Sequence, residues 1–449
     1  MLIAIPARAL RLDLDSAIDR AIRENRSIAI DALNVRSARL GVDRATTRFD
    51  VELRPVLEFG TLDGKSTSLY GIEASKLLPG GTGIAARIES ENFDRTIGRR
   101  ARLAVEINQP LFRDFGRLIN EEPVAQATSD LRRAERLFYT QRSDLVLDVI
   151  FTFENILRLE RQVTADENSV ERAEALLQST RAKESLGRTT RIDSLRVELQ
   201  HGQAQSRLLA DRQQLESEYQ AFAELLGIDF DEEIVLESSE QLELNLPKPV
   251  DAVAQAFDNR LDYAQALQDL EDTKRGTLIA EKLVLPDVTV TGRYTRSDKP
   301  FTFGDEDRSR WFFGVRGDTD LNKRAARIDI ARAELDETSA EQRIRVIELG
   351  ITRDVRQAML RYRRAQAELS PLTSNLENAK TRLELAQRLF EVGRSDNFSV
   401  TDAEDAFLEA QTRLLSGQTQ ATLEAYRYLH TVAALIEFPD ILKPGSRLP

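Results

Sequence analysis

The sequence predicts a mainly α-helical fold with a smaller β portion, built from long antiparallel coiled-coil hairpins and duplicated in tandem. Three observations lead to this fold class. Glycine and proline are concentrated in two short windows, the remaining stretches carry heptad spacing, and the chain resembles itself when it is shifted by 206 residues. The composition agrees, because 31% of the residues are charged and only 6% are aromatic, as in long solvated helices.

The two windows separate the helical stretches. Residues 55–117 hold eight of the 21 glycines, and residues 286–320 hold four more. No proline occurs between Pro123 and Pro247. Because glycine and proline interrupt helices, the intervening stretches are predicted to be helical.

Both windows show the period of two that half-exposed strands have. In 287–295, Val288, Val290 and Tyr294 alternate with polar residues, and 102–108 and 311–318 alternate in the same way. We count about four long β-strands per chain. Alternation alone leaves open an ordinary sheet with one wet face.

The helical stretches have the spacing of a coiled-coil seam. Leu376, Ala379, Leu383, Ala386 and Phe390 follow one another at intervals of 3, 4, 3 and 4 residues. The run 124–186, taken as one helix, would be about 95 Å long at about 1.5 Å per residue. A rod of that length suits a long antiparallel coiled coil and not a compact domain.

The internal repeat divides the chain. A shift of 206 residues places Gly187-Arg188-Thr189 on Gly393-Arg394-Ser395, and the register continues without a gap. Each half then has the order helix, strands, long helix, turn, helix. The predicted domains are a first structural repeat at 12–228 (strands about 55–117, hairpin tip at Gly187), a linker or equatorial segment at 229–248, and a second structural repeat at 249–440 (strands about 286–320, hairpin tip at Gly393).

Several classes of function are disfavoured by what the sequence lacks. It has no cysteine, and its two histidines, His201 and His430, have no metal-ligand spacing. We find no phosphate-binding glycine loop, nucleophile elbow or acid pair. The net charge of −12 argues against a nucleic-acid partner. We therefore expect no enzyme activity, no cofactor and no metal.

Membrane residence would require a β-barrel. No stretch reaches the roughly 18 to 20 apolar residues of a membrane-spanning helix, and lipid tolerates no open sheet edges. Four strands cannot close alone, but three copies would supply a trimeric 12-stranded transmembrane β-barrel. The N-terminal residues 1–8 lack the layout of a secretory signal, so a signal peptide is not evident.

Several short pieces recur in a fixed order along the chain. They are Asn25-Arg26 and Asn259-Arg260 early in each half, Pro55 and Pro286 before the strands, Gln109-Pro110-Leu111-Phe112 with Phe115-Gly116, and the two glycine tips. In this order, residues 12–440 resemble the outer-membrane efflux protein (TolC) family. The resemblance implies a homotrimer with a twelve-stranded barrel in the outer membrane of a Gram-negative-type cell and an α-helical tunnel, an α-barrel, through the periplasm. It also implies a passive duct that docks onto a periplasmic adaptor (membrane fusion) protein and an inner-membrane pump or ABC transporter, in tripartite efflux or type I secretion.

The resemblance also implies roles for residues near the tips. Gly187 and Gly393, with Arg188 and Arg394, match the adaptor-docking tips, although the glycines are also expected as simple turn formers. Asp402 and Ser399 match two positions that are often acidic at the periplasmic entrance, where Asp402 keeps the carboxylate. Asp193 matches a gating position that usually pairs with an arginine. In this sequence, Ser395 occupies the position of that arginine. A solvated helix-start residue is the alternative for Asp402.

The second strand window carries an aromatic cluster. Trp311, Phe312 and Phe313, with Phe301 and Phe303, are candidates for an aromatic girdle where the barrel meets the lipid headgroups. A plain sheet core is the alternative for these residues. For the whole chain, the alternatives are a structural coiled-coil protein or a periplasmic adaptor-type protein without a channel, although an adaptor has one hairpin and this chain has two.

Overall fold

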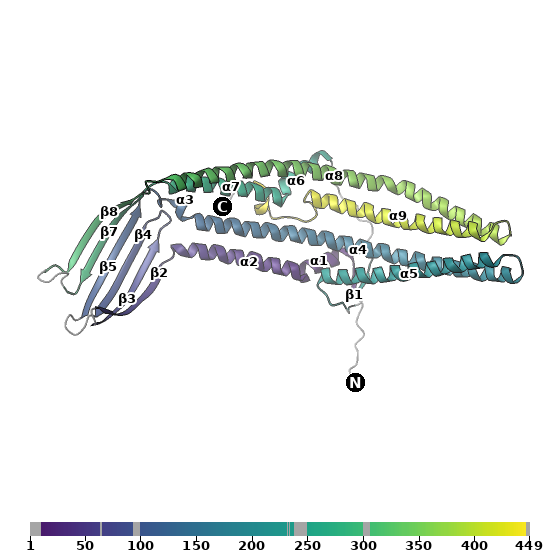
Figure 1. The fold of residues 1–449 in the computed structure, drawn as a ribbon, viewed down its shortest axis with the longest axis horizontal. Coiled ribbons are helices and arrows are strands. Elements are labelled where there is room, and N and C mark those ends of the chain that lie inside the picture. The colour runs from purple at the N-terminus through teal and green to yellow at the C-terminus, as the bar shows by residue number, and fades with distance from the viewer. Residues whose placement is uncertain are drawn as a thin grey trace, which may run out of the picture. The chain divides into compact units, whose positions relative to one another are not determined.

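A computed structural model describes residues 10–62, 65–92, 99–230, 232, 234–237, 249–299 and 306–445 (Figure 1). The chain forms two compact units. Unit 1 comprises Met1–Ala32, Leu137–Leu261 and Glu348–Pro449, and unit 2 comprises Leu33–Arg136 and Asp262–Ile347. Each unit is therefore built from stretches of both halves of the sequence.

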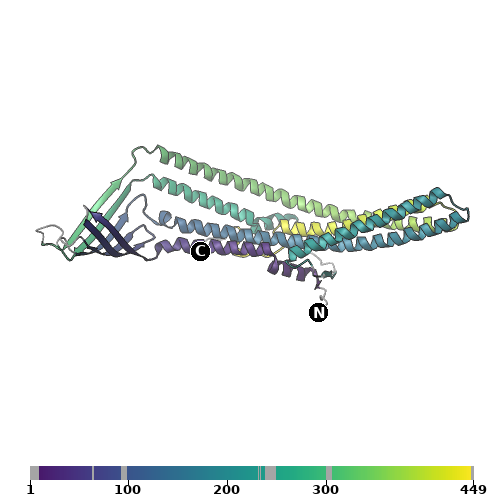
Figure 2. The same ribbon diagram turned by 60° about the horizontal axis from the view of Figure 1, so that its bottom comes forward.

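Unit 1 contains two long helical hairpins. In the first, α4 (Glu122–Ser185) turns into α5 (Arg191–Leu226), and in the second, α8 (Arg324–Glu391) turns into α9 (Asn397–Thr431). Figures 1 and 2 show the turns of the two hairpins next to each other. The unit also contains α1 (Leu14–Glu24), α6 (Pro249–Asn259), η2 (Asp440–Leu442) and the parallel pair β1 (Leu10–Leu12) and β6 (Ile234–Leu236).

The core of unit 1 lies where α1, α4, α5 and α9 meet. Phe153 and Phe222 are fully buried with ring centroids 6.2 Å apart, and Ala17, Leu226 and Leu423 belong to the same cluster. Burying a side chain the size of Phe or Leu contributes about 1.5–3 kcal/mol relative to leaving it exposed. The helices are thus held by a few fully buried apolar side chains among many charged ones.

Asn25 forms a corner between α1 and α2 (Arg26–Thr46). Its Oδ1 accepts hydrogen bonds from the backbone N–H groups of Ser27 and Ile28, at 2.9 and 3.1 Å, and so caps α2. Its Nδ2 donates to the carbonyl oxygen of Leu225 at 2.9 Å. The helical stretch before the first strands is therefore divided into two helices at this capping residue.

Unit 2 is organised around an antiparallel sheet. The first four strands are β2 (Glu52–Leu62), β3 (Lys65–Leu77), β4 (Gly83–Asn92) and β5 (Arg99–Pro110), and β7 (Asp287–Ser297) and β8 (Ser309–Asp318) complete the order β2-β3-β4-β5-β7-β8. The unit also holds most of α2, η1 (Thr47–Phe49), α3 (Arg117–Asn120), nearly all of α7 (Leu261–Leu283) and the first turns of α4 and α8.

The predicted fold class, mainly α with antiparallel strands, is confirmed, but the predicted number of strands is wrong. The described part of the chain places six strands in this sheet, not four. The additional pair is the hairpin β3–β4. The alternation of polar and apolar residues is weak in β4, because positions on both faces of this strand are Gly or Ala. Gly80 and Gly81 were interpreted only as helix breakers and not as the turn of a β-hairpin.

The sheet has one apolar and one ionic face. Residues directly opposite one another on paired strands share a face. One such row is apolar throughout: Leu53, Ala74, Ala86, Val105, Tyr294 and Trp311. The next row, on the other face, begins Arg54, Glu73 and Arg87. The ionic face carries the pairs Arg87–Glu73, Arg102–Glu89 and Arg293–Glu106.

The predicted division into two repeats stays a prediction. The element order helix, strands, long helix, turn, helix does occur twice, and most of the linker 229–248 lies outside the described residues. None of the helices in the described part of the chain is long and apolar enough to cross a membrane.

Candidate functional site

Gly187 forms the turn of the first hairpin in a left-handed conformation. Its φ is +68°, its N–H donates to the carbonyl oxygen of Glu184, and the N–H of Arg188 donates to that of Lys183, both at 2.9 Å. This pair of bonds is the Schellman motif, which satisfies the last carbonyl groups of a helix and favours glycine. Arg188 is exposed beside it.

Gly393 forms the second turn in the same way. Its φ is +73°, its N–H donates to the carbonyl oxygen of Phe390 at 3.2 Å, and the N–H of Arg394 donates to that of Leu389 at 2.8 Å. Nothing lies within 4 Å of where a Cβ would be at either glycine. A side chain at either position would therefore meet no neighbour, and glycine is favoured there for its backbone conformation.

The two tips pack against each other within unit 1. Lys183 Nζ lies 3.3 Å from the centroid of the Phe390 ring and donates to the Phe390 carbonyl oxygen at 3.1 Å. Asn397 Nδ2 donates to Thr180 Oγ1 at 3.1 Å, and both residues are buried. The second hairpin thus contacts the first close to the turns. The two tips together form one composite end of the hairpins.

An exposed apolar pair flanks each tip, and neither pair was predicted from the sequence. Leu186 and Ile192 flank the first turn, and Val392 and Phe398 flank the second, and their exposed fractions range from 57% to 70%. The shift of 206 residues relates Leu186 to Val392 and Ile192 to Phe398. This repetition was available in the sequence and could have identified them. Apolar side chains exposed this far at both ends suit a protein partner.

The predicted entrance residues lie just beyond the second tip. Asp402 is half exposed and forms an ion pair with Arg382 of α8. Ser399 bonds to the N-cap residue instead, since its N–H and its Oγ donate to Asp396 Oδ1 at 2.9 and 2.7 Å. These bonds hold the pKa of the Asp396 carboxyl below its ordinary value. Ser395 is half-buried in the turn.

Asp193 has a local partner. It forms a capping box with Thr190, in which Thr190 Oγ1 and N–H donate to Asp193 Oδ2 at 2.7 and 3.2 Å. The hydrogen bonds from Thr190 lower the pKa of the Asp193 carboxyl. Arg196 lies 3.5 Å away on the same helix. Asp193 is therefore engaged at the start of α5, and its gating role stays a prediction.

The aromatic candidates divide between the two faces of the sheet. Trp311 and Phe313 lie on the apolar face, exposed by 69% and 75%, with their rings stacked at 6.0 Å. Phe312 lies on the ionic face, where the Arg293 guanidinium lies 5.9 Å from its ring centroid. Phe312 is thus separated from the predicted girdle. Phe301 and Phe303 lie outside the described residues.

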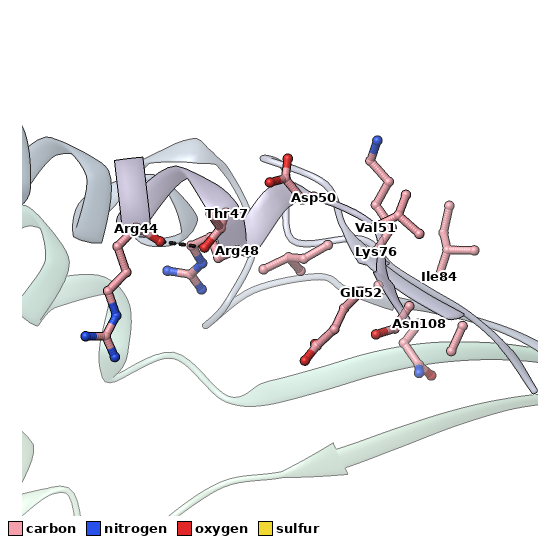
Figure 3. A pocket seen from close by; sticks show the side chains of 13 residues that line it. Arg44, Thr47, Arg48, Asp50, Val51, Glu52, Lys76, Ile84 and Asn108 are labelled. Carbon is pink, nitrogen blue, oxygen red and sulfur yellow. Dashed lines mark hydrogen bonds between the residues drawn. The ribbon is translucent and has the colours of Figure 1, made fainter. Parts of the chain in front are cut away.

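A pocket of about 660 Å³ opens in unit 2 beside the outer strand β2 (Figure 3). Arg44, Arg48 and Lys76 line it together with Asp50 and Glu52, so both signs of charge are present. Within the described ranges no group of three or more metal-ligating side chains comes together. We assign this pocket no chemistry.

Residues 252–431 match the sequence model of a family described as outer membrane efflux protein. No curated protein matches the chain by sequence. Among solved structures, the outer membrane protein VceC of Vibrio cholerae is 16% identical with a TM-score of 0.70, and 94% of this chain and 96% of that one are covered.

Two further solved structures are similar over most of their length. The CmeC outer membrane channel of Campylobacter jejuni is 11% identical with a TM-score of 0.73, covering 94% of this chain and 86% of that one. The open state of the MtrE outer membrane channel of Neisseria gonorrhoeae is 16% identical with a TM-score of 0.69, covering 97% and 94%. At these identities the likeness concerns the fold. The resemblance predicted from the sequence is confirmed: residues 252–431 match the outer membrane efflux protein family by sequence, and nearly the whole chain has the fold of these solved outer membrane channels.

Proposed function

We propose that this chain is one subunit of a trimeric, passive exit duct in the outer membrane of a Gram-negative-type cell, and that it is not an enzyme. The observation that carries the proposal is the sheet of unit 2. Its apolar face is exposed, with Ile72 and Ile88 exposed by 60% and 64%, while its other face carries linked ion pairs. Apolar outward and polar inward is the pattern of a barrel wall in lipid.

The edges of the sheet support assembly. β2 and β8 are its outermost strands among the described residues, and an outermost strand offers a row of backbone donors and acceptors to another chain. Lipid does not tolerate open edges. In the proposed assembly, β8 of one copy therefore pairs with β2 of the next, and three copies close a ring around a water-filled lumen lined by the ionic face.

The tips support a place in a larger machine. The composite end formed by Gly187 and Gly393 presents exposed arginines and the apolar pairs Leu186–Ile192 and Val392–Phe398. We assign this end to docking on a periplasmic adaptor, which links the duct to an inner-membrane pump or ABC transporter. The duct passes small molecules or polypeptides, and the partner supplies the energy.

Assembly and conductance test this function together. The protein is purified from the outer-membrane fraction in detergent, its mass is measured by light scattering, and it is reconstituted into planar bilayers. The expected result is a particle of three copies that dissociates on heating and adds stepwise ion conductance. A monomer in the soluble fraction that adds no conductance contradicts the proposal and favours a structural coiled-coil protein.

A further inference from the structure

The hairpin β3–β4 lies inside the sheet and not on its surface. β3 pairs with β2 from Glu52↔Ser75 to Leu62↔Lys65, and with β4 from Ser68↔Asn92 to Leu77↔Gly83. β4 in turn pairs with β5 over ten residue pairs. The hairpin therefore separates β2 from β5 along nearly its whole length.

Both faces of the sheet continue across this hairpin. On the apolar side, Ile72 of β3 lies opposite Ile88 of β4, which lies opposite Leu103 of β5. On the ionic side, Arg87 Nε donates to Glu73 Oε2 at 2.8 Å, and Arg102 Nη1 donates to Glu89 Oε1 at 3.0 Å. A hairpin surrounded by water would have no reason to keep one face apolar and the other ionic. The continuous pattern therefore indicates that β3 and β4 belong to the same wall as β5, β7 and β8.

The turn of the hairpin is fixed to the segment that leads into α4. The N–H of Gly116 donates to the carbonyl oxygen of Gly80 at 3.0 Å, and Thr82 Oγ1 donates to Gln109 Oε1 at 2.5 Å. Gly81 has a φ of +92°, and a Cβ there would lie 2.6 Å from the carbonyl oxygen of Asp114. This close approach requires glycine, so the turn is built to fit its neighbours.

We infer that β3–β4 is part of the duct wall, so that the ring closed by three copies contains eighteen strands and not twelve. The inference rests on the proposed trimeric function, and it follows because the described residues of each copy place six strands in the sheet. The two strands of a hairpin run in opposite directions. With β3 and β4 between them, β2 and β5 are therefore still antiparallel to each other, as they would be if they were neighbours. The insertion thus enlarges the ring without changing its alternation.

The extra strands widen the ring. With strands about 4.8 Å apart and tilted by about 40°, eighteen strands give a backbone diameter of about 36 Å, whereas twelve give about 24 Å. The lumen is then lined in part by β3 and β4, whose Glu73, Arg87 and Glu89 add three charged side chains per copy.

Electron cryo-microscopy of the intact trimer tests the strand number. We expect eighteen strands in the ring, with β3 and β4 between β2 and β5 in each copy. A trimeric ring of twelve strands, with β3–β4 outside it, overturns the inference and leaves the proposed duct standing. Absence of any trimeric ring counts against the proposed function itself.

Single cysteines provide a second test, because the natural chain has no cysteine. Ile72→Cys and Glu73→Cys are neighbours on β3 that face opposite sides of the sheet. In reconstituted protein, we expect a membrane-impermeant maleimide to react at least tenfold faster with Glu73→Cys than with Ile72→Cys. The pair Leu103→Cys and Arg102→Cys on β5 is the matched control. Equal, fast labelling of both β3 variants beside a clear difference on β5 overturns the inference.

Discussion

Arg172 of α4 forms a forked ion pair with Glu404 of α9, with Nη2 and Nε at 2.7 and 2.9 Å from Oε1. The Glu404 side chain is only 7% exposed. The pair joins the two hairpins of unit 1 below their tips, where Leu176 and Phe407 also pack. Neither residue was selected from the sequence, since both have the appearance of ordinary solvated helix charges.

Removing one partner of this pair is expected to destabilise unit 1. Arg172→Ala leaves the Glu404 carboxylate buried without its cation, and we expect a loss of about 2 kcal/mol, measured as a lower thermal unfolding midpoint. The double variant Arg172→Ala with Glu404→Ala should lose less than the sum of the single variants. Arg413→Ala, which breaks an exposed pair with Glu409, is the control and should cost under about 0.5 kcal/mol.

The raised pKa of Asp166 in α4 leads us to expect that the free energy of unfolding depends on pH. Burial, and then its carboxyl neighbour Asp211, raise the pKa of Asp166 to about 6. The folded state therefore disfavours the charged form, so the unfavourable contribution is present above about pH 6 and disappears as the pH falls toward the unfolded value near 4.

The matching variant is Asp166→Asn. We expect it to be more stable than the natural protein at pH 8, by at most about 3 kcal/mol, and the difference should vanish near pH 4. Thermal unfolding in the same detergent across this pH range measures it. Glu167→Gln, at an exposed position paired with Arg212, is the control. A difference that is independent of pH would contradict the prediction.

Replacing a tip glycine by alanine is expected to lower stability because of the backbone conformation at that position. Gly187→Ala and Gly393→Ala force alanine into a left-handed conformation in open space, so each should lose about 1 kcal/mol. Hydrogen exchange of the amides around each turn measures the local effect, and Gly187→Asn should be intermediate. Gly202→Ala, inside α5 and equally open, should instead gain about 0.5–1 kcal/mol. Identical effects at the three glycines would rule out this explanation.

We expect the side chain of Trp311 to contact lipid. It is the only tryptophan of the chain, and it is exposed on the apolar face of the sheet. Its fluorescence in proteoliposomes should be quenched by phospholipids brominated near the headgroup and much less by iodide in the water. Strong quenching by iodide alone would show that the aromatic cluster faces water. Phe312→Trp in a Trp311→Phe background reports the opposite face and should show the reverse.

The helical part of the fold could be predicted because its signal is repeated many times. Heptad spacing continues over dozens of residues, and glycine at a helix end has a specific conformational reason, as Gly187 and Gly393 illustrate. The strand number could not be predicted in the same way. β4 offers small residues such as Ala85 and Ala86, which alternate in direction but hardly in polarity.

The partners of the site residues could not be predicted for a different reason. Whether Asp402 faces a lumen or pairs with Arg382 depends on the rotation of α9 against α8, which spacing along one helix does not determine. Asp193 shows the opposite case. Its capping box with Thr190 is a local pattern within four residues, and it could have been recognised in the sequence.

The composition of unit 1 has a consequence for synthesis. Its core joins Ala17, Phe153, Phe222, Leu423 and Tyr426, which come from three separate stretches of chain. During synthesis, the apolar side of α1 stays in water until the second stretch supplies α4 and α5, and the core is complete only when the third stretch supplies Leu423 and Tyr426. Contacts between such distant positions form slowly and leave unfinished chains prone to aggregation. The stretch that carries α9 therefore determines when this core is complete.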